Sequence, residues 1–251
     1  MPPPIRMRAP FSPQLDLPPP FRALALREHR DAFREAQRLA SQEGAGTLVW
    51  VGRFDLVEFA VVLEPDEPLQ GARRAFFAGC VALADALAVH APPEKPIVWE
   101  WPDAIRVDGG LVGGTRLAWP PSAPEHEPPP WLVFGATIRI VAMTDREPGL
   151  RPLSAALAEE GFDDLVAGQL IESFARHLMV AIDAWQESGF STVGQAYLSR
   201  LAGMPNTQRS IDAVGNLLVR NSTTGQLVTR ALLPALADPS WLDATTGAPR
   251  L

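Results

Sequence analysis

Blocks of apolar residues alternate with polar, proline-rich and glycine-rich stretches, and their spacing predicts which blocks are helices. Residues 24–46 (LALREHRDAFREAQRLASQEGAG) place apolar side chains near one face of a helix that two glycines end. Residues 68–90 are apolar around most of the helix that they predict, so we expect this helix to be buried. A longer amphipathic helix should span residues 163–187, starting at two aspartates that suit its N-terminal dipole, and a short one should follow near 191–202.

Shorter apolar runs predict the strands. Residues 47–51 (TLVWV) and 56–63 (LVEFAVVL) should form two of them, and WLVFGATIRIVAM, which starts at Trp131, should form another. Near the end of the chain, residues 217–220 and 227–230 flank a Thr-Gly turn and predict a small hairpin.

Residues 97–119 (IVWEWPDAIRVDGGLVGGTRLAW) predict an unusually apolar hairpin. A strand-like run leads to a Trp-Pro-Asp corner, an Asp-Gly turn follows, and the return strand carries a Gly-Gly pair. Glycine inside a strand leaves the backbone bare, which lets a ligand or another chain segment approach closely. The alternative interpretation of these glycines is a set of bulges in an edge hairpin.

Strands and helices are interspersed without a regular βαβ rhythm, which favours an α+β fold with a mixed β-sheet flanked by helices. We expect a proline-rich arm over residues 1–20, a main domain over 21–203 and a small C-terminal β domain over 204–251.

Composition and motifs exclude several classes of function. A net charge of -7 argues against a broad nucleic-acid interface, and no apolar run is long enough for a membrane helix. The N-terminus lacks the apolar core of a signal peptide, so we expect a cytoplasmic protein. The histidines show no metal-ligand spacing, Cys80 is the single cysteine, and neither a P-loop nor a GxSxG elbow is present. We therefore expect no metal site.

Three motifs, in order, resemble the catalytic domain of biotin and lipoate protein ligases. That family carries Lys-Trp-Pro-Asn-Asp, then Lys-Leu-Ala-Gly, then Gly-x-Gly-Ile-Asn. The counterparts here are EWPDA at 100–104, LVGG at 111–114 and FGATIR at 134–139. SIDAVGNLLV, at 210–219, resembles the small SH3-like domain that closes many of these ligases. The resemblance extends over about residues 22–232 and is nearest to a proteobacterial branch called the biotin/lipoate protein ligase family.

The resemblance implies a reaction and a site. A ligase of this kind binds biotin, lipoate or octanoate, uses ATP and Mg²⁺ to form an acyl-adenylate, and transfers the acyl group to a lysine of a carrier domain. It implies a monomer or homodimer, while the charge and hydropathy given above lead us to expect no nucleic-acid or membrane partner. The implied substrate-binding residues on the corner and the two glycine-bearing strands are Trp101, Pro102, Asp103, Gly113, Gly114 and Gly135.

The sequence departs from the family pattern where charge is handled. Glu100 occupies the position of the lysine that stabilises negative charge during adenylation, which leaves the catalytic residues unassigned. Asp103 replaces the asparagine after Trp-Pro. The nucleotide-covering loop between the first two strands is reduced to Gly52-Arg53-Phe54-Asp55.

Arginines bordering the implied pocket can supply positive charge. Strand alternation puts Arg116 on the same side as Gly114, and Arg139 on the same side as Gly135. We hypothesise that Arg53, Arg116 and Arg139 bind the anion in place of the missing lysine. The alternative is that they are surface arginines on solvated faces.

Three functions follow from these observations. One is an ATP-dependent acyl-protein ligase. The second is an adenylate-independent lipoyl or octanoyl transferase, which would normally need a nucleophile, whereas Cys80 is expected inside an apolar helix. The third is a pseudoenzyme that binds a small acid or a carrier domain without catalysis.

Overall fold

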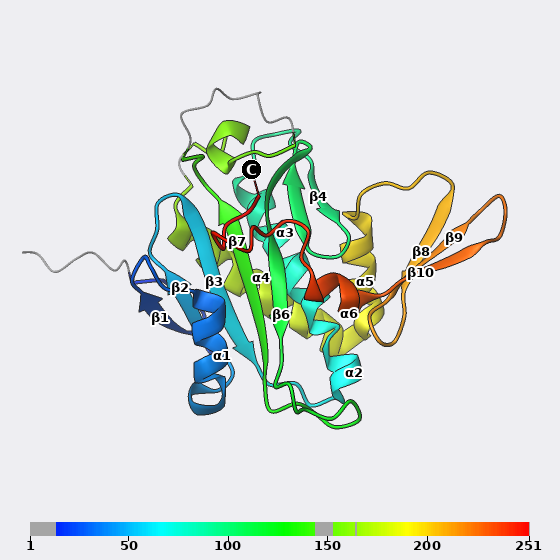
Figure 1. Ribbon diagram of the computed structural model, residues 1–251, viewed down its shortest axis with the longest axis horizontal. Helices are drawn as coiled ribbons and strands as arrows, with labels where there is room; N and C mark the ends of the chain where they lie inside the picture. Colours follow the sequence, from blue (N-terminus) through cyan, green and yellow to red (C-terminus); the bar gives the residue numbers. More distant parts are fainter. Residues whose placement is uncertain (1–13, 144–152, 164, 251) are drawn as a thin grey trace, which may run out of the picture.

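The computed structural model describes residues 14–143, 153–163 and 165–250 (Figure 1). Its main body is a seven-stranded sheet in the order β1-β2-β3-β7-β6-β5-β4, in which β1 and β2 are parallel and the other neighbours are antiparallel. The strands are β1 Arg22–Leu26, β2 Thr47–Val51, β3 Leu56–Leu63, β4 Ile97–Glu100, β5 Ala104–Val107, β6 Gly110–Ala118 and β7 Leu132–Arg139. The predicted strands at 47–51 and 56–63 are confirmed, and so are the apolar hairpin and β7.

Helices cover both faces of this sheet, which confirms the predicted α+β fold. On one face, α3 (Ala75–His90) contacts β4 and β6, and α4 (Ala167–Ser188) contacts β3 and packs on α3 and on α5 (Phe190–Ser199). On the other face, α1 (Ala32–Glu43) contacts β2, β3 and β7 (Figure 1). We call these the α3–α5 face and the α1 face.

The central strands are apolar in every register position because they are buried on both sides. In β3, Phe59 and Val61 belong to the core under α3 and α4, whereas Ala60 and Val62 belong to the core under α1. A strand with two covered faces reads as a continuous apolar run rather than as an alternating one. This explains why periodicity alone found these strands without indicating their faces.

The first predicted helix begins later than expected. Arg22–Leu26 is a strand that pairs in parallel with β2, and α1 starts at Ala32. Asp31 caps the helix, since its Oδ1 accepts a hydrogen bond from the N–H of Arg34 at 2.9 Å. The prediction was wrong over residues 24–31 because the apolar residues of a short strand and of the helix were read as one period.

The buried helix predicted over residues 68–90 is confirmed in two pieces, α2 (Leu69–Ala72) and α3. The break falls at Arg73, whose Nη1 donates to Oε2 of Glu125 at 2.6 Å. Glu125 belongs to the proline-rich loop before β7, so the break fixes that loop to the body of the protein.

The long helix α4 begins at Ala167 rather than at Asp163, so its predicted start was wrong; Asp164 lies outside the described residues. Phe162 and Leu165 are buried in the core instead of entering the helix. Burial of these two side chains outweighs the preference of aspartate for a helix N-terminus.

A second, three-stranded antiparallel sheet follows α5 and projects from one end of the body (Figure 1). Its strands are β8 Thr207–Ile211, β9 Leu217–Asn221 and β10 Leu227–Arg230, and α6 (Leu232–Ala237) follows. The two predicted hairpin strands are confirmed, whereas β8 was missed because TQRSI is mostly polar. Leu217 and Leu232 are fully buried in the main core.

The domain boundaries at 20/21 and 203/204 stay predictions. Residues 1–13 of the predicted arm lie outside the described residues, and Leu15 and Leu17, which follow, pack against the core. Among the helices of the described ranges, none has the length and apolarity needed to cross a membrane.

Candidate functional site

The Trp-Pro-Asp corner joins β4 to β5 and is held from the α3–α5 face. The Trp101–Pro102 peptide bond is cis. Trp101 stacks on Phe77 of α3 with ring centroids 5.9 Å apart, and the hydroxyl of Tyr197 in α5 donates to the carbonyl of Pro102 at 2.8 Å. Packing therefore explains both residues of the corner, and their contact with a substrate stays a prediction.

Two of the three slot glycines lie on the α1 face. In the β6–β7 ladder Gly114 stands opposite Thr137, and Arg116 stands opposite Gly135. Because directly opposed residues share a face, these four residues are grouped as strand alternation predicted. Gly113 lies on the other face, and a Cβ there would meet the Thr137 carbonyl oxygen at 2.1 Å.

Side chains of the protein itself cover the two glycines of the α1 face. A Cβ on Gly135 would lie 2.5 Å from the ring of Phe33, in the first turn of α1. A Cβ on Gly114 would lie 2.4 Å from the indole of Trp241, which follows α6 and is 1% exposed. A ring therefore packs on the bare backbone at each of the two glycines, as expected for a ligand, but both rings are side chains of the protein.

Arg116 is a desolvated cation beside this surface. Its guanidinium lies 4.3 Å from the centre of the Phe33 ring, and its Nη2 is 3.8 Å from Oδ1 of Asp31. Nε has no hydrogen-bond partner within the described residues. Burial lowers the pKa of Arg116, and the carboxylates of Asp31 and Glu58 oppose that shift. The guanidinium thus keeps donor capacity for an anion.

Arg139 lies two residues beyond Thr137 on the same face of β7, and it is 5% exposed. Its Nη1 donates to the carbonyl of Ala155 at 3.4 Å, and its Nη2 donates to the carbonyls of Pro249 and, at 3.3 Å, Arg250. Arg139 therefore connects the sheet to the C-terminal segment that carries Trp241.

A row of three residues crosses the α1 face between the two arginines. Glu58, Thr137 and Gly114 are opposed in turn across β3, β7 and β6. Glu58 accepts a hydrogen bond from the N–H of Ala32 at 2.8 Å, and burial raises its pKa. The Thr137 hydroxyl has no hydrogen-bond partner in the described part of the chain. The lone carboxylate in LVEFAVVL was a signal for Glu58 that the sequence analysis missed.

Asp103 is a buried acid at the edge of the same surface, with 1% of the residue exposed. Burial raises the pKa of Asp103 to about 7, and the nearby indole N–H of Trp241 opposes the rise. The two groups do not align in a hydrogen bond. Neither Oδ2 of Asp103 nor Nε1 of Trp241 has a partner among the described residues.

Glu100 and Lys95 are both engaged in ion pairs. Glu100, whose side chain is 51% exposed, accepts from Nε of Arg106 at 2.8 Å. Lys95 is the only lysine in the sequence, and its Nζ lies 2.7 Å from Oδ2 of Asp108 and 2.8 Å from Oε2 of Glu160.

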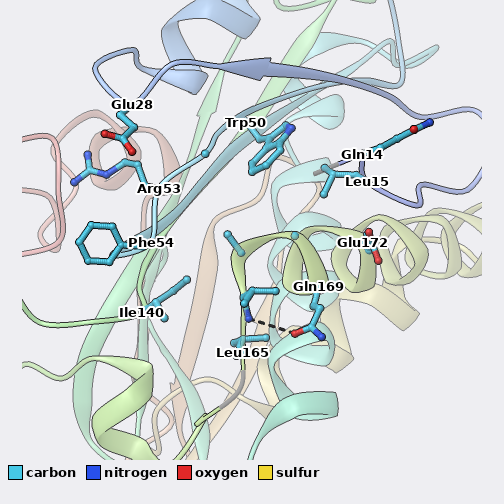
Figure 2. A pocket seen from close by; sticks show the side chains of 14 residues that line it. Gln14, Leu15, Glu28, Trp50, Arg53, Phe54, Ile140, Leu165, Gln169 and Glu172 are labelled. Atoms are coloured by element: carbon cyan, nitrogen blue, oxygen red, sulfur yellow. Dashed lines mark hydrogen bonds between the residues drawn. The ribbon is translucent and has the colours of Figure 1, made fainter. Parts of the chain in front are cut away.

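The turn between β2 and β3 reaches the end of β7, since the carbonyl of Asp55 accepts a hydrogen bond from the N–H of Ile140, the residue after Arg139, at 2.8 Å; Arg53 lies in this turn. Its Nε and Nη2 donate to the two oxygens of Asp55 at 2.9 and 2.6 Å within the β2–β3 turn. That turn borders a cavity of about 500 Å³ at the start of α4 (Figure 2). No described residue that lines the cavity lies on β6. Its apolar lining includes Leu15, Trp50, Phe54, Ile140 and Leu165.

The thiol of the chain is not placed for nucleophilic chemistry. Cys80 is fully buried in α3, 3.5 Å from Oγ1 of Thr115, and burial raises the pKa of its thiol well above the ordinary value. A thiolate, the reactive form, is therefore disfavoured there. Within the described ranges, no group of three or more His, Cys, Asp and Glu side chains could hold a metal ion.

Among the solved structures that resemble this fold are one of a protein of unknown function and one of a ligase. A biotin protein ligase-like protein of unknown function from Silicibacter sp. TM1040 is 29% identical, with a TM-score of 0.72 over 86% of this chain and 96% of that chain. Biotin protein ligase from Aquifex aeolicus, in complex with biotin and ATP, is 13% identical, with a TM-score of 0.60 over 83% of this chain and 98% of that chain. The second likeness concerns the fold alone.

Sequence comparison gives the same relationship. A biotin–acetyl-CoA-carboxylase ligase from Paracoccus denitrificans is 26% identical over 191 residues, which are 68% of this chain and 76% of that protein. Residues 17–199 match the biotin/lipoate A/B protein ligase family. The resemblance found in the hairpin motifs is thereby confirmed: the chain belongs to the biotin/lipoate A/B protein ligase family.

Proposed function

We propose that this protein binds a small carboxylic acid, of the size of biotin, lipoate or octanoate, on the α1 face of β6 and β7. One observation carries the proposal: a buried arginine, Arg139, and a partly buried one, Arg116, stand on that face on either side of the Gly114–Thr137 pair. A guanidinium recognises a carboxylate through two parallel hydrogen bonds, and burial strengthens the attraction.

The spacing suits an acid of this size. Two residues along a strand span about 7 Å, so an acid centred on Gly114 and Thr137 would bring its carboxylate to one of the arginines. The related Aquifex ligase was solved with biotin and ATP, which supports a small acid as the ligand of this fold.

The charged residues favour recognition of the acid without adenylation. Adenylation brings a carboxylate and a triphosphate together and needs fixed positive charge between them. At the family's lysine position stands Glu100, already paired with Arg106. Lys95 is held by two carboxylates, and Arg53 is paired through two hydrogen bonds with Asp55. These residues do not fit ATP and Mg²⁺.

A second candidate is an acyl-protein ligase, which the similarity to the Paracoccus ligase favours. It would form an acyl-adenylate and transfer the acyl group to a lysine of a carrier domain. A transferase that uses a protein nucleophile is less favoured, because the single thiol, Cys80, is buried. The carrier-domain partner, the monomeric or homodimeric state and the cytoplasmic location stay predictions.

Calorimetric titration with biotin, lipoate and octanoate tests the proposal. We expect at least one acid to bind, and we expect Arg116→Gln or Arg139→Gln, whichever removes the arginine that receives the carboxylate, to weaken binding about tenfold or more, because it removes a charged hydrogen-bonding group. Arg220→Gln, at an exposed position of β9, is the matched control and should bind like the parent.

Isotope exchange between pyrophosphate and ATP separates the two candidates. The proposal predicts no exchange with any of the three acids in the presence of Mg²⁺. Exchange with any acid would establish the ligase instead. Failure of all three acids to bind would reject acid recognition at this site.

A further inference from the structure

The surface around Gly114, Thr137 and Arg139 on the α1 face, which we call the seat, holds a part of the chain that has the shape and polarity of a ligand. The segment after α6, residues 241–250, crosses in front of β6 and β7 (Figure 1) and lays Trp241 on Gly114. The indole edge with Nε1 lies directly over the glycine, 2.4 Å from the position of a Cβ. Only a bare backbone admits a ring at that distance.

The same segment also presents acceptors to an arginine of the proposed site. Nη2 of Arg139 donates to the carbonyl oxygens of two successive residues, Pro249 and Arg250. Two neighbouring acceptor oxygens at a guanidinium resemble a carboxylate. The segment therefore offers a flat ring at Gly114 and an acceptor pair at Arg139, two strand positions beyond Thr137, about 7 Å away.

The segment is bonded mainly to itself. Leu242 and Pro249 form an isolated antiparallel bridge, the N–H of Asp243 donates to the carbonyl of Ala248 at 2.9 Å, and the N–H of Arg250 donates to the carbonyl of Trp241 at 2.7 Å. These bonds stay intact when the segment moves as a unit. Its departure therefore breaks few hydrogen bonds to the sheet.

The polar groups of the seat are poorly satisfied by Trp241. Oδ2 of Asp103, Oγ1 of Thr137 and Nε1 of Trp241 are all buried without a hydrogen-bond partner in the described residues. Each unsatisfied buried group is unfavourable, so a ligand that pairs them gains an advantage over the indole. Trp241 brings a ring N–H beside Asp103 without aligning it, so a ligand whose ring N–H aligns with the carboxyl would pair it.

We infer that residues 241–250 are an internal stand-in for the ligand, and that the ligand is a carboxylic acid bearing a planar ring with an N–H group, which displaces them. This inference rests on the proposed function and narrows it. The ring takes the place of Trp241 on Gly114, and the carboxylate takes the place of the two carbonyls at Arg139. Linear acids do not supply the ring or the N–H.

Calorimetric titration tests this with biotin and indole-3-butyrate as ring acids and octanoate as the linear acid. Trp241→Ala should bind both ring acids at least tenfold more tightly than the parent, and should bind octanoate at least tenfold more weakly than biotin. Trp185→Ala removes a partly buried indole from α4 on the opposite face and should match the parent.

A measurement on the intact chain covers the case in which the variant fails to fold. In protein labelled with 5-fluorotryptophan, the ¹⁹F resonance of Trp241 is assigned by its loss in Trp241→Phe. Adding biotin should shift it to the frequency of a solvent-exposed indole. Binding of an acid without this shift, or equal affinity of parent and Trp241→Ala, overturns the inference and leaves the proposed function standing. If no acid binds to any form, both are rejected.

Discussion

At the residue scale, Asp103 ties the stability of the protein to pH. Its pKa is about 7 in the folded state, mainly because of burial, and 3.8 is the ordinary value. Between these values the folded state binds more protons than the unfolded state, so the free energy of unfolding falls as pH rises, by up to about 1.4 kcal/mol per pH unit. The stability that the protonated carboxyl of Asp103 contributes is fully present below pH 4, and it is lost above pH 7.

Asp103→Asn removes this dependence because an amide does not ionise. Urea unfolding from pH 4 to 8 should show the variant gaining stability over the parent as pH rises, by about 2–4 kcal/mol in all. The difference should level off above pH 7. A difference that stays constant over this range would show that the carboxyl is not desolvated.

Gly114 has no room for a side chain. A Cβ would lie 2.4 Å from the Trp241 ring and 2.5 Å from the backbone oxygen of Asp103. The oxygen is part of the β5–β6 ladder and cannot move freely, so Gly114→Ala should cost about 1–3 kcal/mol. Chemical denaturation measures this cost. Gly203→Ala, where nothing lies within 4 Å, is the control and should be close to neutral.

At the element scale, the first turn of α1 positions Phe33 over Gly135. Asp31 caps that turn through the N–H of Arg34, so Asp31→Ala should lower the free energy of unfolding by about 1 kcal/mol. Asp31→Asn keeps an acceptor at the cap and should lose much less. Thermal unfolding of the two variants compares them, and equal losses would mean that the charge facing Arg116, rather than the cap, is responsible.

The elements that the sequence predicts well are those whose burial is continuous. The strands at 47–51 and 56–63 and the buried helix at 68–90 are visible because nearly every residue is apolar. β1 and β8 are stabilised by pairing with a neighbouring strand, which leaves a weak pattern in their own residues. Backbone pairing of this kind belongs to tertiary structure and not to local sequence.

For the site, the sequence predicted the groupings that depend on alternation along a single strand. Alternation along β6 and β7 correctly grouped Arg116 with Gly114, and Arg139 with Gly135, because strand parity is a local property. The covering residue Trp241 lies more than 100 positions from the strand that it covers. The part of Arg53 in the site stays a prediction: it lies in the turn beside the end of β7 and is paired with Asp55.

At the scale of the whole molecule, the small C-terminal sheet shares the core of the main body. Leu217 is fully buried in that core, so Leu217→Ala should cost about 2–5 kcal/mol. We expect the parent to unfold in one transition, with far-ultraviolet circular dichroism and tryptophan fluorescence coinciding.

Leu217→Ala should move that single transition to a lower concentration of denaturant. A separate early transition, with the main body unaffected, would instead show that residues 204–251 form an independent domain.

The single lysine has a consequence for the chemistry that the chain itself can undergo. The hydrogen bonds that Lys95 donates to Asp108 and Glu160 raise the pKa of Lys95, which keeps its amine protonated and weakly nucleophilic at neutral pH. A reactive acyl donor in solution therefore meets one side-chain amine, and that amine is held as an ammonium ion. The side chains of this sequence resist self-acylation, and an amine-reactive reporter applied at high pH would mark one side chain, just before β4.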